Sequence, residues 1–249
     1  MSREDLNRVE PNRVIAWLAR RRMPLMFGTV GVVLLIPVFL ALTILIPFLS
    51  ERRVARHVES MGGTFSTEYF GPEWLTPSLR TQFPLFDRIT VVNLNRGKNT
   101  DRVVPSLCLL KHLETLDLEL SDVSDEGLKS LGRLSQLRGL GLNHTGIADI
   151  GLGYLRPLTG LQGLHLDGTK ITDAGVKHLQ SMSHLQILKL SNTLVSDAGV
   201  EVLFDLHELQ ILNLAESRVT RRGFVSLRQA LPNCELPVIF DMHLPMSVF

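Results

Sequence analysis

The apolar positions in the second half of the chain recur with a fixed period of 24 residues. Each clear copy opens with a leucine, has leucines three and five residues later, and continues through a Ser or Thr, a β-branched residue and a glycine. Residues 161–182, which read LQGLHLDGTKITDAGVKHLQSM, are the best example. The opening leucines are Leu113, Leu137, Leu161, Leu185 and Leu209. The frame extends to six units over residues 89–232 and a partial seventh, and such a period predicts a solenoid.

Each unit reads as one strand followed by one helix. The alternation of apolar residues around the second and third leucines is typical of a strand. A hydroxyl residue such as Thr172 then suits the N-cap of a helix, and Asp173 falls in the first turn, where the helix dipole favours a carboxylate. Val176 and Leu179 follow at helical spacing. We expect these aspartates to stabilise helix ends rather than to bind a ligand.

The dimensions of the two elements predict the shape. Parallel strands stack about 4.8 Å apart, whereas packed helices need roughly 8–10 Å between their axes. A coil with strands on one side and helices on the other must therefore curve with its strands inside. The fold class we expect is α/β: a right-handed solenoid that forms a horseshoe arc, with a concave parallel sheet and convex helices.

The repeat resembles the leucine-rich repeat family over residues 89–240. Its ITDAG form is similar to the subfamily that includes the F-box leucine-rich-repeat receptors, but that group carries cysteine where this chain has Thr145, Thr169 and Thr193. Thr or Ser at this place resembles the short repeat proteins of bacteria, many of them membrane-anchored. The resemblance implies a protein partner bound on the concave face.

An uncharged apolar segment, residues 23–49, precedes the repeats. As a helix it would exceed the roughly 30 Å of a bilayer core, so the sequence predicts one transmembrane helix ahead of the solenoid. Six arginines precede the segment and three follow it closely, which favours a cytoplasmic N-terminus and an extracytoplasmic repeat domain in the cell membrane. A cleaved signal peptide and the inverted topology are the alternatives.

These features divide the chain into five parts. They are a cytoplasmic segment 1–22, the transmembrane helix 23–49, an N-terminal cap 51–88, the repeat domain 89–240 and a tail 241–249. In the cap we expect a helix over residues 52–61, a first strand over residues 64–66 and a second short helix that opens at residues 71–75. The cap would shield the apolar face of the first repeat.

Composition and motifs exclude several functions. Lys and Arg number 26 against 25 Asp and Glu, a balance that argues against a nucleic-acid partner. Two cysteines are too few for a disulfide scaffold or a four-thiolate zinc site. The sequence has no nucleophile elbow, phosphate loop or HExxH motif, so we expect neither an enzyme nor a cofactor or metal.

The candidate binding residues are those that each strand turns toward the concave face. Gly139, Gly141 and Gly163 would form a trough among them, and Glu119, Asn143 and Asp167 would stack in one row. The polar candidates are Thr115, Asp117, Glu119, Asn143, His165, Asp167, Lys189 and Asn213. They indicate either a binding patch for a cationic or hydroxyl-rich group or an ordinary solvated face. The same arc could instead self-associate as a structural envelope protein, or serve as a cytoplasmic scaffold similar to the F-box-type receptors.

Overall fold

A computed structural model describes residues 38–73, 76–82 and 84–236. The chain forms two compact units, Met1–Pro47 and Phe48–Phe249. Of the first unit, the described residues form a short helix that includes the π-helical turn η3 (Ala41–Leu45) and the start of α3. The second unit contains the repeats.

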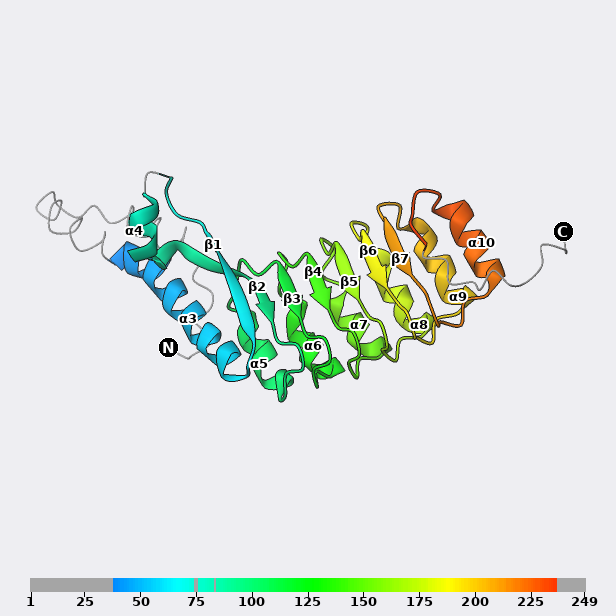
Figure 1. Cartoon of the computed structure of the whole chain (residues 1–249), viewed down its shortest axis with the longest axis horizontal. Coiled ribbons are helices and arrows are strands. Elements are labelled where there is room, and N and C mark those ends of the chain that lie inside the picture. Colours follow the sequence, from blue (N-terminus) through cyan, green and yellow to red (C-terminus); the bar gives the residue numbers. More distant parts are fainter. Residues whose placement is uncertain (1–37, 74–75, 83, 237–249) are drawn as a thin grey trace, which may run out of the picture. The chain divides into compact units, whose positions relative to one another are not determined.

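The second unit is built on a seven-stranded sheet whose strands follow one another in sequence order. β1 is antiparallel to β2, and every later pair is parallel. The strands are β1 (Thr64–Tyr69), β2 (Asp87–Asn93), β3 (Thr115–Asp117), β4 (Gly139–Gly141), β5 (Gly163–His165), β6 (Ile187–Lys189) and β7 (Ile211–Asn213). Figure 1 shows β2–β7 side by side along the inner side of a shallow arc. The predicted parallel sheet is therefore confirmed.

A helix follows each of the strands β2–β7, and these helices line the other side of the sheet (Figure 1). They are α5 (Thr100–Leu107), α6 (Asp125–Leu131), α7 (Asp149–Leu155), α8 (Asp173–Val176), α9 (Asp197–Val200) and α10 (Arg221–Ala230). After α8 and α9 the chain tightens into the 3₁₀ turns η5 (Lys177–Ser181) and η6 (Glu201–Asp205). The strand and helix of each predicted unit are thus present.

The leucines of the repeat form a continuous core between sheet and helices. Leu140, Leu164 and Leu188 are direct neighbours across the sheet, and each is at most 2% exposed. Leu166 and Val176 are fully buried as well. Burial of one such side chain contributes about 1.5–3 kcal/mol. Because each repeat covers the next, the leucine ladder stabilises the whole stack.

The threonine that follows each of the strands β4, β5 and β6 is also buried, and its hydroxyl group is satisfied locally. Thr169 is 5% exposed, and its Oγ1 donates to the carbonyl oxygen of Leu166 at 2.6 Å. Thr145 and Thr193 make the equivalent bond at 2.7 Å. A buried hydroxyl that bonds the backbone carries no desolvation penalty from an unpaired group, so threonine fits the place that cysteine takes in the F-box receptors.

The aspartate at the start of each helix bonds the following repeat. Asp149 Oδ1 accepts from the backbone N of Thr172 at 2.8 Å, and its Oδ2 accepts from the Thr172 hydroxyl at 2.6 Å. Asp101, Asp125, Asp173 and Asp197 accept from the equivalent residues of their next repeats. A Cβ at Gly175 would collide with Asp149 Oδ1, which explains the recurring glycine. These carboxylates therefore join neighbouring repeats.

The hydroxyl residues before the helices act as predicted in two repeats. Thr172 and Ser196 accept a capping bond from the backbone N two residues later. Ser124 and Thr220 occupy the same N-cap position without that bond. Their hydroxyls donate to Asp101 and Asp197 instead. The predicted capping role is therefore confirmed for two of the four residues.

The N-terminal cap differs in detail from the sequence prediction. Helix α3 (Ile46–Ser60) packs Val54, Ala55 and Val58 onto the first repeat. Glu51, also buried, accepts from the backbone N of Ile89 at 3.3 Å and lies 3.7 Å from Arg88 Nε. β1 runs three residues beyond the predicted strand.

The prediction of a helix opening at residues 71–75 was wrong for its described part, because the helix α4 begins only at Pro77 (Pro77–Gln82). The Tyr69 hydroxyl donates to the carbonyl oxygen of Pro72 at 2.9 Å and holds the segment between them as a turn. The 3₁₀ turn η4 (Pro84–Phe86) then leads into β2. At the other end of the solenoid, the last strand is reduced to a single parallel bridge between Ile211 and Glu235.

The predicted transmembrane helix lies only partly within the described residues. Residues 23–37, like the segment 1–22 and the tail 241–249, lie outside them. Over residues 38–49 the chain is helical, and large apolar side chains such as Phe39 and Leu42 are 65% and 60% exposed. Within the described residues, no helix combines the length and the apolar character needed to cross a bilayer.

Candidate functional site

The concave face of the sheet is organised in three rows of residues that run across the strands. The register pairs each residue with the one 24 positions later. The first row is Val91, Thr115, Gly139, Gly163, Ile187 and Ile211; the second is Asn93, Asp117, Gly141, His165, Lys189 and Asn213. The third follows the strand ends: Asn95, Glu119, Asn143, Asp167, Ser191 and Ala215. Adjacent members of a row lie about 4.8 Å apart.

Two of the three glycines of the predicted trough, Gly139 and Gly163, face open space. A Cβ built at Gly163 would meet nothing within 4 Å, and one at Gly139 would meet only Thr115 at an ordinary 3.4 Å. Packing of the fold therefore does not require glycine at either position. This contrasts with Gly175, where a Cβ would collide with an aspartate of the preceding repeat. The trough is room that the fold leaves open.

The side chain of Asp117 lies over Gly141, the third glycine of the trough. Its Oδ2 accepts from Asn95 Nδ2 at 3.1 Å, and its Oδ1 accepts from the backbone N of Glu119 at 3.1 Å. A Cβ at Gly141 would lie 2.5 Å from Oδ1, so the carboxylate leans across this glycine toward β5. Asn95 was expected on the concave face but was not among the predicted binding residues. Its position one repeat before Glu119 in the same row was the signal available.

The third row holds the ends of the strands together by side-chain bonds. Asn95 Oδ1 accepts from the backbone N of Glu119 at 3.0 Å, and Asn143 Oδ1 accepts from that of Asp167 at 2.9 Å. Asp167 Oδ1 accepts in turn from the backbone N of Ser191 at 2.7 Å. Asn143 is only 9% exposed. Its prediction as an outward-facing binding residue was therefore wrong, because its side chain turns in to satisfy the backbone of the next repeat.

His165 stands at the far side of the trough, opposite Asp117 in the second row. Burial, and secondly the positive charge of Lys189, lower the pKa of His165 from its ordinary value of 6.5. Asp167, Asp117 and Glu119 act in the opposite direction but do not outweigh these effects. His165 is therefore predominantly neutral at pH 7. The face around the trough then carries three carboxylates and one ammonium group.

Six of the eight predicted residues lie around the trough, and two do not: Asn143, which is buried, and Asn213. Thr115 lies exposed beside Gly139, and Lys189 is the direct neighbour of His165. Asn213 lies one strand further, on β7, where its Oδ1 accepts from the backbone N of Ala215 at 3.1 Å. The group at the trough therefore consists of Thr115, Asp117, Glu119, His165, Asp167 and Lys189.

A parallel sheet built strand by strand from 24-residue leucine repeats, and backed by one helical segment per repeat, defines a leucine-rich-repeat solenoid. Comparison with protein families agrees with this class. Two models described as leucine-rich repeats match residues 110–132 and residues 159–219. These two matched segments of the chain are therefore leucine-rich repeats. No curated protein matches it.

Several solved structures share the repeat fold. An internalin of Listeria monocytogenes is 24% identical, with a TM-score of 0.49 over 59% of this chain and 39% of its own. Internalin C2 of the same organism is 21% identical, with a TM-score of 0.45 over 59% and 70% of the two chains. A leucine-rich-repeat protein of Leptospira interrogans is 22% identical, with a TM-score of 0.42 over 53% and 39%. The chain thus spans well under half the length of two of these proteins, and the likeness concerns the fold alone.

Proposed function

We propose that this protein is a single-pass membrane protein whose repeat domain binds another protein through its concave face. The N-terminus lies in the cytoplasm and the repeats lie on the other side of the membrane. The protein acts by binding and not by catalysis, since the residues around the trough form no nucleophile–base pair.

The observation that carries the binding role is the trough itself. The packing of the fold does not require glycine at Gly139 or Gly163. Glycine in a strand lowers the stability of the fold by roughly 0.5–1 kcal/mol relative to alanine. In their own row the room that these two glycines leave ends at Thr115 on one side and Ile187 on the other, and Asp117 and His165 lie in the neighbouring row. Three carboxylates against one ammonium group favour a partner that presents a cationic or hydroxyl-rich side chain here.

The membrane role rests on the sequence and on the exposed side chains of residues 38–49. Uncharged apolar sequence extends over residues 23–49, and its described part presents large apolar side chains to the surroundings. Exposed apolar area of this kind is typical of a membrane or partner contact. The arginine excess before the segment supports a cytoplasmic N-terminus.

The binding role is tested with substitutions that remove charge but keep the bonds of the third row. Asp117→Asn with Asp167→Asn preserves the Oδ1 acceptors and removes two carboxylates. Partners are captured by cross-linking to the full chain in its native membrane, and the amount recovered is compared with that of the unsubstituted protein. We expect a clear loss, because charge complementarity across an interface is reduced.

The matched control is Glu201→Gln with Asp205→Asn, which removes two exposed carboxylates on the helical side. This pair should leave capture unchanged. If the helical pair abolishes capture and the concave pair does not, the working surface is the convex one. Gly163→Val gives an independent check of the trough. The valine side chain would fill the free space at this position, and valine is a residue that strands favour.

A further inference from the structure

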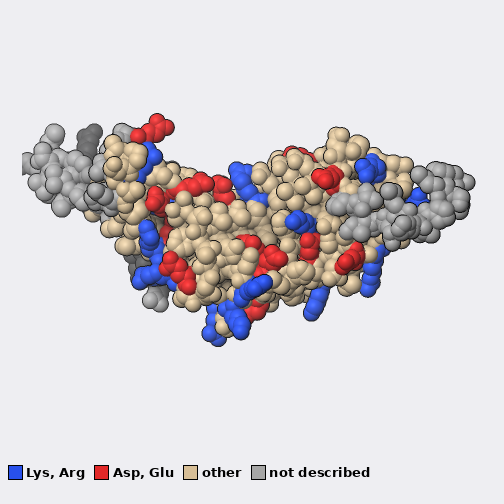
Figure 2. Space-filling view, viewed as in Figure 1, with Lys and Arg blue, Asp and Glu red and all other residues tan. Residues whose placement is uncertain are grey.

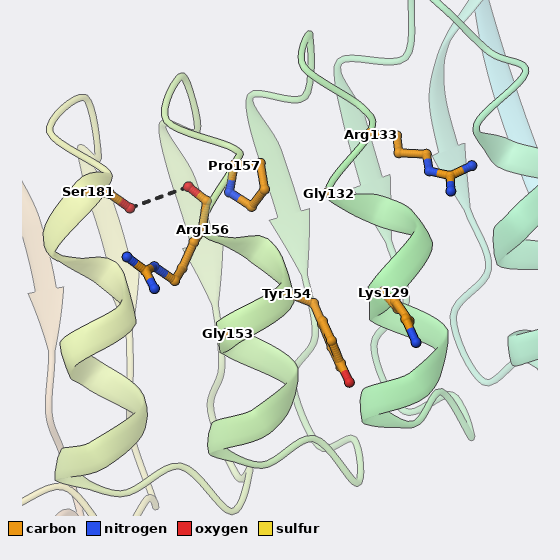
Figure 3. Close-up of a pocket in the computed structure, with 8 residues that line it drawn as sticks. All are labelled: Lys129, Gly132, Arg133, Gly153, Tyr154, Arg156, Pro157 and Ser181. Carbon is orange, nitrogen blue, oxygen red and sulfur yellow. Dashed lines mark hydrogen bonds between the residues drawn. The ribbon is translucent and has the colours of Figure 1, made fainter.

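A second hollow lies on the helical side of the solenoid and is separate from the concave site. It has a volume of about 580 Å³ and crosses the C-terminal ends of α6 and α7 toward η5. Lys129, Arg133 and Arg156 line it, with the ring of Tyr154 between them and no acidic residue in the lining (Figure 3). On the face of the molecule seen in Figure 2, acidic and basic side chains are otherwise interspersed.

The positive charge of this hollow is largely unneutralised. Arg133 and Arg156 are exposed on opposite sides of it (Figure 3), and within the described residues neither guanidinium group has a carboxylate at ion-pair distance. Lys129 lies 3.9 Å from Glu126, and both of these side chains are exposed. Glu126 also accepts from the Tyr154 hydroxyl at 3.4 Å. One carboxylate therefore stands beside three cations.

The hollow also contains a backbone acceptor that the fold leaves open. In α6 the backbone N of Arg133 donates to the carbonyl oxygen of Ser130 at 3.2 Å. One repeat later the donor position is taken by Pro157, which has no N–H, so only the next bond of the turn is kept: Leu158 N donates to Leu155 O, as Leu134 N donates to Leu131 O. In the part of the chain that the structure describes, no hydrogen-bond donor reaches Tyr154 O.

This carbonyl lies close to Gly132 of the preceding repeat. A Cβ at Gly132 would lie 2.7 Å from Tyr154 O, so any side chain at position 132 would cover this oxygen from the α6 side. Accessible acceptors at a helix end are normally satisfied by water, a side chain or a ligand. A ligand that fills this hollow therefore meets cations and a hydrogen-bond acceptor together.

We propose that the hollow binds an extended acidic segment of a partner polypeptide. Carboxylates of the segment pair with Arg133 and Arg156, since guanidinium groups match carboxylates in two-point hydrogen bonds. A backbone N–H of the segment donates to Tyr154 O. A phosphate chain satisfies the cations equally well but offers no donor for the carbonyl. This surface is additional to the concave site and does not depend on it.

The test uses a fluorescent hepta-glutamate peptide as the probe, titrated with the full chain in detergent and followed by fluorescence anisotropy. We expect Arg133→Gln with Arg156→Gln to weaken binding about 3- to 10-fold, as for the loss of two exposed ion pairs. The matched control, Arg221→Gln with Arg222→Gln, removes the same charge from exposed positions on α10 and should keep the original affinity. Equal losses in the two variants overturn the proposal, because attraction by net charge then explains the binding.

A second variant separates a peptide from a phosphate ligand. Pro157→Ala restores an N–H that can bond Tyr154 O, as Arg133 N bonds Ser130 O. We expect this change to weaken the peptide several-fold and to leave competition by inorganic tripolyphosphate unaltered. If tripolyphosphate outcompetes the peptide and Pro157→Ala affects neither, the hollow is an anion site and its assignment to a polypeptide is wrong.

Discussion

Glycines in this protein serve two different purposes, and only their surroundings distinguish them. Gly175 is required by the fold, because the space of its missing side chain is taken by the carboxylate of Asp149. That carboxylate cannot simply swing away, since Thr172 donates to both of its oxygens. Gly163 faces open space on the concave sheet. The same residue type therefore marks a junction between repeats in one place and a candidate binding surface in the other.

This difference predicts opposite effects of two alanine substitutions. Gly175→Ala should destabilise the protein by about 1–3 kcal/mol, because the new methyl group displaces Asp149 from its partners. Gly163→Ala should be neutral or stabilise by up to about 1 kcal/mol, since alanine restricts the unfolded chain. Urea denaturation of the two variants measures both values. Similar losses in the two variants would mean that the trough is packed and not open.

His165 gives the concave face a dependence on pH. Its pKa is lowered in the folded protein by burial and by Lys189, so unfolding allows it to take up a proton more readily. The contribution of His165 to the free energy of unfolding is therefore full well above pH 6.5 and declines as the pH falls through about 6.5 toward the lowered value. Comparison of denaturation curves between about pH 5 and pH 7 isolates this contribution.

The control for this effect is His165→Gln. It keeps a polar side chain of similar length and removes the titration. The difference in stability between the two proteins should change over this pH range and stay constant above it. A constant difference throughout would show that His165 has an ordinary pKa in the folded protein.

At the scale of the element, the sequence predicted the strand–helix unit well because its period fixes the register. The leucine spacing placed Leu164, Leu166 and Val176 in the core, where they are fully buried. The boundaries outside the repeats were harder to predict. The turn between Tyr69 and Pro72 depends on a side-chain bond that no local pattern reveals.

The candidate site was predictable to the same extent as the register. The pairing of Asp117 with Gly141 and of His165 with Lys189 followed from the period of 24. The inward turn of Asn143 did not, because it depends on a bond to the backbone of the next repeat. The hollow at Tyr154 was also hidden in the sequence, since it arises from a proline and a glycine that come together across two helices.

The core and the surface of one repeat should respond very differently to truncation. Leu164→Ala removes a fully buried side chain in the middle of the stack and should cost about 2–5 kcal/mol. Lys170→Ala, at an exposed position six residues later, should change the free energy of unfolding by no more than about 0.5 kcal/mol. Thermal or urea denaturation provides the comparison. Equal effects would contradict the register of the repeat.

At the scale of the whole molecule, the proposed membrane anchor predicts on which side of a bilayer the repeats lie. A reporter that is active only after export, fused behind Phe249, should be active according to the proposed orientation. Replacement of Arg20, Arg21 and Arg22 by neutral residues should reduce this activity, because positive charge close to the segment sets the orientation. Activity of a cytoplasmic reporter at the same position would place the repeats in the cytoplasm and favour a scaffold there.

The bonds between repeats also give the stack a direction. Each aspartate accepts from the repeat that follows it, so a folded repeat presents a ready acceptor to the next one made. Removal of repeats from the C-terminal end leaves one carboxylate, which water solvates. Removal from the N-terminal end instead deprives the new first helix of the carboxylate that held its N-cap. These bonds therefore favour folding that proceeds from the N-terminal repeats, because each following repeat donates to acceptors that are already in place.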